Sequence, residues 1–177
     1  MLIAANKIDL PNSEKNLLDC KKQFPEYKII PISAESELAL KEAANKKLID
    51  YVPGNNSFEV KNVTEQQKKA LEFIKANVLE KFGSTGVQET INTSVFELLD
   101  YMAVFPAGTG KLGDSKGNIL PDCFLLPKGS TAIDFANKIH SDLAKNFVAA
   151  IDCKTKRKIG RDTELKHRDA IEIMTTK

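Results

Sequence analysis

The tetrapeptide Asn-Lys-Ile-Asp at positions 6–9 has the side chains needed to recognise guanine. The Asp9 carboxylate offers two acceptor oxygens, which can take the N1–H and the exocyclic N2–H of guanine together. Adenine cannot supply this pair of donors, so Asp9 is the predicted specificity residue. The methylene groups of Lys7 can lie along the face of the base, and Asn6 can fix the loop and contact the base edge.

A second segment, Ser-Ala-Glu at positions 33–35, completes the predicted base site. It follows the apolar run 29–32, as the tetrapeptide follows the apolar run 2–5. Both runs predict short strands, and open α/β sheets bind ligands beyond the carboxyl ends of their strands. A backbone N–H of the second segment is expected to donate to the guanine carbonyl. The predicted nucleotide-binding residues are therefore Asn6, Lys7, Asp9, Ser33 and Ala34. A chance match to a four-residue pattern is the alternative.

The sequence contains no loop of the type that holds a nucleoside triphosphate. Such a loop reads Gly-x-x-x-x-Gly-Lys-Ser/Thr, and further segments hold Mg²⁺ and the attacking water. The nearest pattern, at 108–111, lacks the first glycine and the final hydroxyl, so it is interpreted as a flexible turn. We assign no catalytic residue and no metal ligand. The chain alone is expected to be inactive, with Mg²⁺ and the missing motifs belonging to a complete protein in which they precede Asn6.

Composition favours a soluble, globular, cytoplasmic protein. Of the 177 residues, 42% are hydrophobic and 28% are charged, which is enough to bury a core. Cys20, Cys123 and Cys153 are scattered, which argues against a disulfide framework or a zinc site and fits a reducing compartment. No apolar run has the length needed to cross a bilayer, so no membrane partner is predicted.

Positive charge is concentrated towards the C-terminus. Residues 1–103 contain 13 Lys and Arg against 15 Asp and Glu, whereas residues 104–177 contain 13 against 9. A cluster of five cations in the second part lies on a predicted hairpin tip: Lys154, Lys156, Arg157, Lys158 and Arg161. Such a cluster can meet phosphates without reading bases, so it is the predicted RNA contact. A solvated turn kept basic for solubility is the alternative.

Helical patterns separate and follow the two predicted strands. Residues 12–24 predict a polar helix that turns Leu17, Leu18 and Cys20 inward, and residues 38–51 predict a second helix.

Two further helices are predicted over 64–82 and 87–101, the first opened by a capping box between Thr64 and Gln67. The second is expected to bury an apolar stripe that includes Ile91 and Leu98. Between them, Gly-Ser-Thr-Gly at 83–86 predicts a left-handed helix end, with a phosphate-holding loop as the alternative.

From Tyr101 onwards the pattern indicates a small α+β unit with the strand order of a β-grasp domain. The strand with Pro121 is placed at a sheet edge. The predicted elements are strands at 102–106, 119–126, 147–151, 157–160 and 170–175 and a helix at 131–143.

Segment 119–143, with 150–160 behind it, resembles a TGS domain, a module named for threonyl-tRNA synthetases, certain GTPases and SpoT-type proteins. The motifs at 6–9 and 33–35, the junction at 82–88 and this unit, in that order, are similar to the C-terminal half of archaeal GTPases of the Obg/YchF group. The resemblance implies a translation-associated protein that binds GTP or GDP and contacts the ribosome.

The predicted architecture therefore has three parts. Residues 1–52 are the α/β remnant of a P-loop GTPase domain whose N-terminal half is missing, residues 53–100 are a helical segment, and residues 101–177 are an α+β β-grasp (TGS, ubiquitin-like) domain. Two functions stay open: a fragment of a GTP-binding protein that recognises guanine and docks on the ribosome or on structured RNA, or an RNA-binding or ribosome-binding TGS module whose nucleotide site is vestigial.

Overall fold

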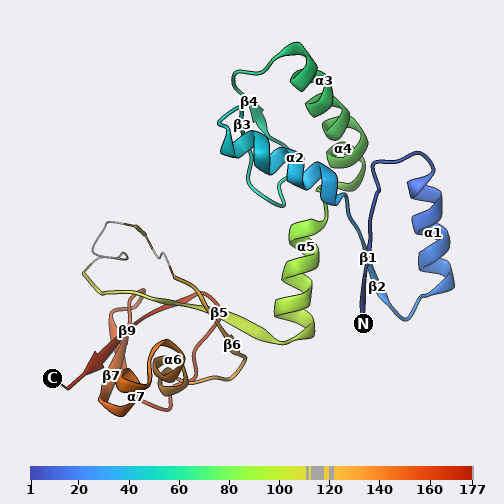
Figure 1. The fold of residues 1–177 in the computed structure, drawn as a ribbon. Coiled ribbons are helices and arrows are strands. Elements are labelled where there is room, and N and C mark those ends of the chain that lie inside the picture. The colour runs from blue at the N-terminus through green and yellow to red at the C-terminus, as the bar shows by residue number, and fades with distance from the viewer. Residues whose placement is uncertain (111, 113–117, 120–121, 177) are drawn as a thin grey trace. The chain divides into compact units, whose positions relative to one another are not determined.

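The computed structural model describes residues 1–110, 112, 118–119 and 122–176. The chain divides into two compact units, Met1–Ser94 and Val95–Lys177, which we describe separately (Figure 1). The sequence predicts three parts instead, with boundaries after residues 52 and 100, and these boundaries stay a prediction.

The first unit begins with a two-stranded parallel sheet. Strands β1 (Leu2–Ala5) and β2 (Lys28–Pro31) pair in register from Leu2 opposite Lys28 to Ala5 opposite Pro31. Helix α1 (Ser13–Gln23) is the crossover that a parallel pair requires. Both strands thus end at the same edge, which confirms the two predicted strands and the helix between them.

The rest of this unit is mainly helical and has its own small hairpin, in which β3 and β4 pair antiparallel. The elements are α2 (Ala34–Asn45), β3 (Ile49–Asp50), β4 (Glu59–Val60), α3 (Glu65–Ile74), the π-helical turn η1 (Lys75–Leu79), α4 (Glu80–Phe82) and α5 (Val87–Asn92). The core of this part consists of Ile8, from the loop after β1, with Leu40, Ile49, Leu71, Ile74, Val78 and Leu79 of these elements.

The caps of the α3 to α4 segment are those that the sequence predicts. The Gln67 N–H donates to Thr64 Oγ1 (3.3 Å), and the Thr64 N–H donates to Gln67 Oε1 (2.9 Å), so the capping box is formed. The segment ends at Gly83, whose φ of 81° is left-handed. A glycine accepts this conformation without steric penalty, which confirms the predicted helix end.

Two expectations for the first 51 residues are wrong. Leu18 is 57% exposed instead of inward, because α1 buries none of its residues against the narrow sheet. The helix predicted over 38–51 ends at Asn45, and residues 49–50 form β3 instead.

The early end of α2 has a local cause. Lys47 adopts a left-handed φ of 57°, and the N–H groups of Lys47 and Leu48 donate to the carbonyls of Ala44 and Ala43 at 2.8 and 2.9 Å. This is the hydrogen-bond pattern of a Schellman motif, which usually has glycine at the left-handed position. Because a lysine occupies that position, the sequence gives no stop signal.

Helix α5 continues into a second π-helical turn, η2 (Thr93–Leu98), in which the division between the units falls. The predicted apolar stripe is wrong here, since Ile91 and Leu98 are 51% and 50% exposed. A π-helical turn is wider than an α-helical turn, so side chains at α-helical spacing do not stay on one side.

The second unit is a mixed sheet with helices on one face, the β-grasp arrangement (Figure 1). The strand order is β6-β5-β9-β7-β8, with β5 and β9 parallel and the other neighbours antiparallel. Its elements are β5 (Tyr101–Pro106), β6 (Phe124–Pro127), α6 (Ala132–Ile139), α7 (Ser141–Lys145), β7 (Phe147–Asp152), β8 (Arg157–Ile159) and β9 (Asp169–Thr175).

The core of this unit lies between the sheet and α6. Phe135 and Ala136 of α6 are fully buried, and Phe135 packs edge-on against Phe124. β6 is an edge strand as predicted, whereas Leu120 and Pro121 of the predicted strand lie outside the described residues. The helix predicted over 131–143 is two helices, because His140 is extended and its Nδ1 accepts from the Asp142 N–H (3.2 Å).

Candidate guanine-binding site

The shared edge of β1 and β2 brings the two predicted base-recognition segments together. Beyond the last strand pair, the Ile32 N–H donates to the Ala5 carbonyl (2.8 Å) and the Ile8 N–H donates to the Ile32 carbonyl (3.2 Å). The tetrapeptide at 6–9 and the Ser33–Ala34 turn are therefore held side by side by main-chain bonds. Parallel pairing makes this adjacency necessary once the two strands are in register.

The Asn6 side chain connects the two segments directly. Its Oδ1 accepts from its neighbour, the Lys7 N–H (2.8 Å), and from the Ala34 N–H (3.2 Å). Asn6 therefore holds the loop, as the sequence predicts. The Ala34 N–H, one of the backbone donors of the segment predicted to meet the guanine carbonyl, donates to Asn6 Oδ1 in this structure.

Asp9 is held by one of its two oxygens. The Ser33 hydroxyl donates to Asp9 Oδ1 at 2.7 Å. Within the part of the chain that the structure describes, no hydrogen bond or ion pair engages the other oxygen, Oδ2. Asp9 is partly exposed and lines a cavity of about 930 Å³ in the first unit. The carboxylate is thus oriented by Ser33 while one oxygen stays open to a ligand.

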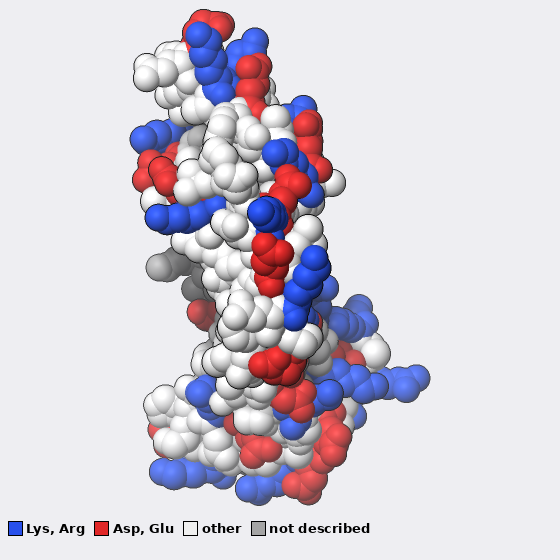
Figure 2. All heavy atoms as spheres, turned by 90° about the vertical axis from the view of Figure 1, so that its right-hand side faces the viewer, with Lys and Arg blue, Asp and Glu red and all other residues white. Residues whose placement is uncertain are grey.

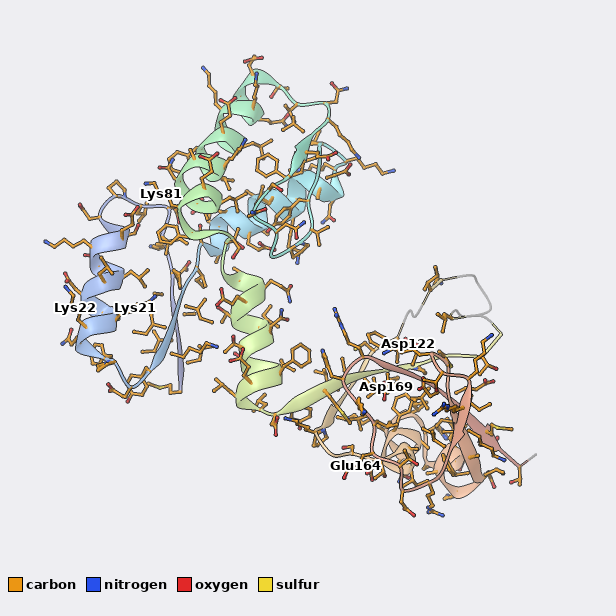
Figure 3. The ribbon with its side chains drawn as sticks, turned by 180° about the vertical axis from the view of Figure 1, so that it is seen from behind. Lys21, Lys22, Lys81, Asp122, Glu164 and Asp169 are labelled. Carbon is orange, nitrogen blue, oxygen red and sulfur yellow. The ribbon has the colours of Figure 1, made fainter. Side chains whose placement is uncertain are left out.

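The walls of this cavity come from the loop after β1, from α1 and from the α3 to α4 segment. They include Leu10, Leu18 of α1 and Phe73 of α3. The helices are also tied by an ion pair between Lys81 of α4 and Glu14 of α1 (3.5 Å), and Figure 3 labels Lys81 on its helix and Lys22 on α1. Of the five predicted nucleotide-binding residues, Asp9 lines this cavity, Asn6 and Lys7 line a second cavity of about 300 Å³, and Ser33 and Ala34 line neither.

Lys7 lies between Asn6 and Asp9 in a left-handed conformation, with φ of 69°. This conformation is uncommon for a residue other than glycine and is often found where a side chain is presented to a ligand. The Lys7 side chain is exposed, so its methylene groups are available to cover one face of a base.

A buried polar cluster beneath the site was missed by the sequence analysis. Ser33, Ser36, Glu37 and Thr85 are all at most 5% exposed, and Glu37 Oε2 accepts from the Thr85 hydroxyl (2.6 Å) and the Tyr51 hydroxyl (2.7 Å). Burial, followed by the bond to Glu37, raises the pKa of Tyr51 to about 12, so this hydroxyl stays a donor at neutral pH. No sequence signal pairs Glu37 with Thr85, because 48 residues separate them.

The predicted RNA-binding cations lie at one end of the second unit, on and beside the β7–β8 turn. All five side chains are exposed: Lys154, Lys156, Arg157, Lys158 and Arg161. The structure does not place them on one face, because Arg157 and Lys158 are consecutive in β8 and point to opposite sides of the sheet. β8 is also an edge strand, where charged side chains discourage pairing with another chain.

The β7–β8 turn is well defined by Asp152. Its carboxylate accepts from the Thr155 hydroxyl (2.7 Å) and from the Lys154 N–H (2.9 Å). The Thr155 hydroxyl bond is the main reason that the pKa of Asp152 lies below its ordinary value. Lys154 Nζ is 3.8 Å from Asp169 Oδ1, and Figure 3 labels Asp169 in this unit. On the face in Figure 2, Lys and Arg side chains alternate with Asp and Glu side chains.

Two classes of site are not found in the part of the chain that the structure describes. No three His, Cys, Asp or Glu side chains come together as a metal ion would require. Among the same residues, no helix has both the length and the apolar composition that a membrane span needs.

Comparison with known proteins gives two family matches that together cover nearly the whole chain. Residues 4–108 match the family described as "Obg-like GTPase YGR210-like, G4 motif-containing domain". Residues 110–175 match the TGS domain. The order of the two matches is that of the predicted architecture.

Individual relatives agree with these matches. The chain is 48% identical, over 179 aligned residues, to a GTP-binding protein of Methanocaldococcus jannaschii, covering 99% of this chain and 45% of the relative. A crystal structure of a GTP-binding protein from Pyrococcus horikoshii superposes with a TM-score of 0.68 and 41% identity, covering 99% of this chain and 46% of that one.

A more distant structure, the YchF GTPase of Schizosaccharomyces pombe, shares the fold with a TM-score of 0.51 at 17% identity, over 89% of this chain and 38% of that one. The chain thus spans about half the length, or less, of the proteins that it matches.

Proposed function

The chain belongs to the YGR210-like family of Obg-like GTPases, and from this premise we propose that it recognises guanine through Asn6, Lys7, Asp9, Ser33 and Ala34. In this proposal it is part of a cytoplasmic GTP-binding protein. The phosphates of GTP or GDP, and Mg²⁺, are bound by residues of a longer protein, since this sequence has no phosphate-binding loop. The TGS domain then serves as a second, separate docking module.

The orientation of Asp9 is the observation that carries the guanine proposal. Ser33 Oγ donates to Asp9 Oδ1 (2.7 Å), which holds the carboxylate at the loop edge with Oδ2 directed to no described partner. A carboxylate oxygen has two lone pairs, so Oδ1 can accept a second hydrogen while Oδ2 accepts another. Guanine presents two adjacent donors that match this arrangement, and a charged acceptor strengthens both bonds.

The remaining residues support the base from its other sides. The exposed Lys7 side chain is proposed to cover one face of the ring, and the Ala34 N–H to donate to the guanine carbonyl. Because that N–H donates to Asn6 Oδ1 at 3.2 Å in this structure, guanine binding requires Asn6 to share or release it. A vestigial site, the other function left open, would keep the Asn6 to Ala34 bond and bind no guanine.

We predict that the chain alone binds GTP only weakly, with a dissociation constant above about 100 μM. Base contacts are a few hydrogen bonds of modest net worth, whereas the charged phosphates and Mg²⁺ carry most of the interaction in P-loop proteins. Isothermal titration of the chain with Mg²⁺–GTP, and with guanosine as a control, measures this. Micromolar affinity for GTP would show that the chain contains a phosphate site not identified in its sequence.

We further propose that the TGS domain docks on ribosomal or other structured RNA through Lys154, Lys156, Arg157, Lys158 and Arg161. The proposal is supported by five exposed cations around one ordered turn and by the basic excess of the C-terminal part. Cations meet phosphates without regard to base sequence, so the contact is expected to depend on RNA shape and on salt.

The triple variant Lys156→Glu, Arg157→Glu and Lys158→Glu is expected to lower binding to purified ribosomes by more than about tenfold at low salt. Each lost phosphate contact reduces the slope of log affinity against log salt by about 1, so the slope should fall by up to about 3. Sedimentation with ribosomes between about 50 and 200 mM salt measures both quantities, because electrostatic binding changes most over this range.

The matched control makes the same change of charge elsewhere. Lys15, Lys21 and Lys22 are exposed lysines of α1, in the first unit, and Figure 3 labels two of them. Their triple replacement by Glu is expected to leave the salt slope unchanged. Equal losses in both triple variants would assign the binding to net charge and remove the β7–β8 turn from the proposal.

A further inference from the structure

The loop Gly83–Gly86 contacts the Ser33–Ala34 turn by its main chain. The Ser33 N–H donates to the Thr85 carbonyl (2.9 Å), although 52 positions separate the two residues in the numbering. Ser33 and Thr85 are both fully buried. The same Ser33 donates its hydroxyl to Asp9, so a single residue connects Thr85 to the proposed specificity carboxylate.

Thr85 also contacts helix α2 by its side chain. Its hydroxyl donates to Glu37 Oε2 (2.6 Å), and Glu37 is 5% exposed. Glu37 belongs to the first turn of α2, which the Ser33 cap begins, and its N–H donates to the Ser33 carbonyl (3.1 Å). Thr85 therefore holds the Ser33–Ala34 turn at two points.

The Glu37 carboxylate is not needed to fill the space between α2 and Thr85. Removing a carboxylate from water opposes folding, and its hydrogen bonds offset this only in part, so apolar side chains of similar size would stabilise the fold at least as well. Unlike an apolar side chain, the carboxylate fixes the positions of its neighbours, because its hydrogen bonds form only when the Thr85 and Tyr51 hydroxyls lie at the correct distances. The loop Gly83–Gly86 is also closely packed at Gly86, where a Cβ atom would be 1.9 Å from the Pro31 carbonyl oxygen.

From these contacts we propose that Thr85 is a positioning residue of the guanine site: through Glu37 and the Ser33 amide it fixes the Ser33–Ala34 turn, and through Ser33 it fixes Asp9. The loop Gly83–Gly86 thereby acts on base recognition without touching the base. This inference rests on the proposed guanine function and names a determinant that lies outside both recognition segments.

The test uses Thr85→Val, which keeps the shape of the side chain and removes its hydroxyl. Guanosine affinity, measured by ligand-observed NMR on the native chain and the variant, is expected to fall at least about tenfold. Amide exchange of Ser33 is expected to accelerate by a similar factor, because the Thr85 carbonyl loses its fixed position. Thr85→Ser, which keeps the donor, is expected to restore both readouts.

A matched control separates positioning from general loss of structure. Thr90→Val removes a hydroxyl from α5, where that hydroxyl donates to the carbonyl of Gly86, the N-cap of the same helix (2.9 Å), and not to α2 or to the Ser33–Ala34 turn. This control should leave guanosine affinity and Ser33 exchange unchanged. If Thr85→Val does not fold, Glu37→Gln removes the charge at nearly constant size and is expected to weaken guanosine binding about threefold.

Equal guanosine affinity in the native chain and the Thr85→Val or Glu37→Gln variant would overturn the positioning role. If the native chain binds no guanosine, the proposed function fails, and exchange at Ser33 decides the positioning role by itself. Faster exchange in Thr85→Val than in Thr90→Val then supports it, and equal exchange rejects it.

Discussion

Replacement of Asp9 by asparagine is expected to change the base preference of the chain from guanosine to xanthosine. In the native structure Ser33 Oγ donates to Asp9 Oδ1. An asparagine at this position keeps an acceptor oxygen for Ser33, so its amide nitrogen takes the place of the open Oδ2. A donor then faces the N2–H of guanine and repels it, whereas xanthine has a carbonyl there and accepts.

The expected loss for guanosine is large because two charge-assisted hydrogen bonds are affected. Such bonds contribute about 1.5–3 kcal/mol each, so guanosine affinity should fall at least about 30-fold. Xanthosine affinity should rise by about tenfold, since one neutral hydrogen bond replaces a repulsion. Ligand-observed NMR at millimolar nucleoside, with adenosine as a third ligand, measures these ratios on the chain itself.

Asp19→Asn is the matched control for this exchange. Asp19 lies on α1, is exposed, and lines the same cavity as Asp9, but it is not adjacent to Ser33. The same loss of charge at Asp19 is expected to leave guanosine and xanthosine affinities within about twofold. A loss of guanosine binding in Asp9→Asn without a gain for xanthosine would mean that Asp9 supports the loop and does not contact the base.

The parts of this structure that the sequence predicts are those set by local chemistry. A Thr that bonds to the residue three positions ahead favours a helix start, so α3 begins directly after Thr64, as its capping box predicts, and α6 begins directly after Thr131, at the start of the predicted helix. Short runs of mainly apolar residues likewise place β5, β7 and β9. From these elements the β-grasp order follows, because few arrangements of such a short chain are possible.

The parts that the sequence does not predict depend on conformations with no residue signature. Lys47 ends α2 in a left-handed conformation that glycine would have signalled. The π-helical turn η2 changes which side chains of the segment after Val87 face inward, and nothing in the residue types there marks a wider turn.

The candidate site likewise has contacts that the sequence predicts and contacts that it does not predict. Because two parallel strands end together, the sequence predicts that Asn6 and Asp9 lie next to Ser33. The structure adds the hydrogen bond from the Ser33 hydroxyl to Asp9 Oδ1. The bond between Glu37 and Thr85 joins distant segments through ordinary residue types. These segments meet only in the folded protein, so residues such as Thr85 cannot be assigned to the site from the sequence.

Gly86→Ala is expected to be the most destabilising single substitution that we propose. The added Cβ would lie 1.9 Å from the Pro31 carbonyl oxygen and 3.0 Å from Ile32 Cγ2. Gly86 also has a φ of +74°, which costs an L-residue about 1–2 kcal/mol, and forcing the backbone apart costs about 1–3 kcal/mol more. The first unit is therefore expected to lose about 2–5 kcal/mol of its unfolding free energy.

Gly83→Ala separates these two causes, because Gly83 has a similar φ of +81° but no atom within 4 Å of the added Cβ. It should cost only the strain, about 1–2 kcal/mol. Urea unfolding followed by amide NMR signals of each unit measures both variants, with the second unit as an internal reference. Because the backbone strain is nearly the same in Gly86→Ala and Gly83→Ala, the difference between their losses of unfolding free energy measures the close approach of the Gly83–Gly86 loop to β2. Equal losses would mean that the loop is not pressed against the carboxyl end of β2, and the route from Thr85 through Ser33 to Asp9 would then have no rigid support.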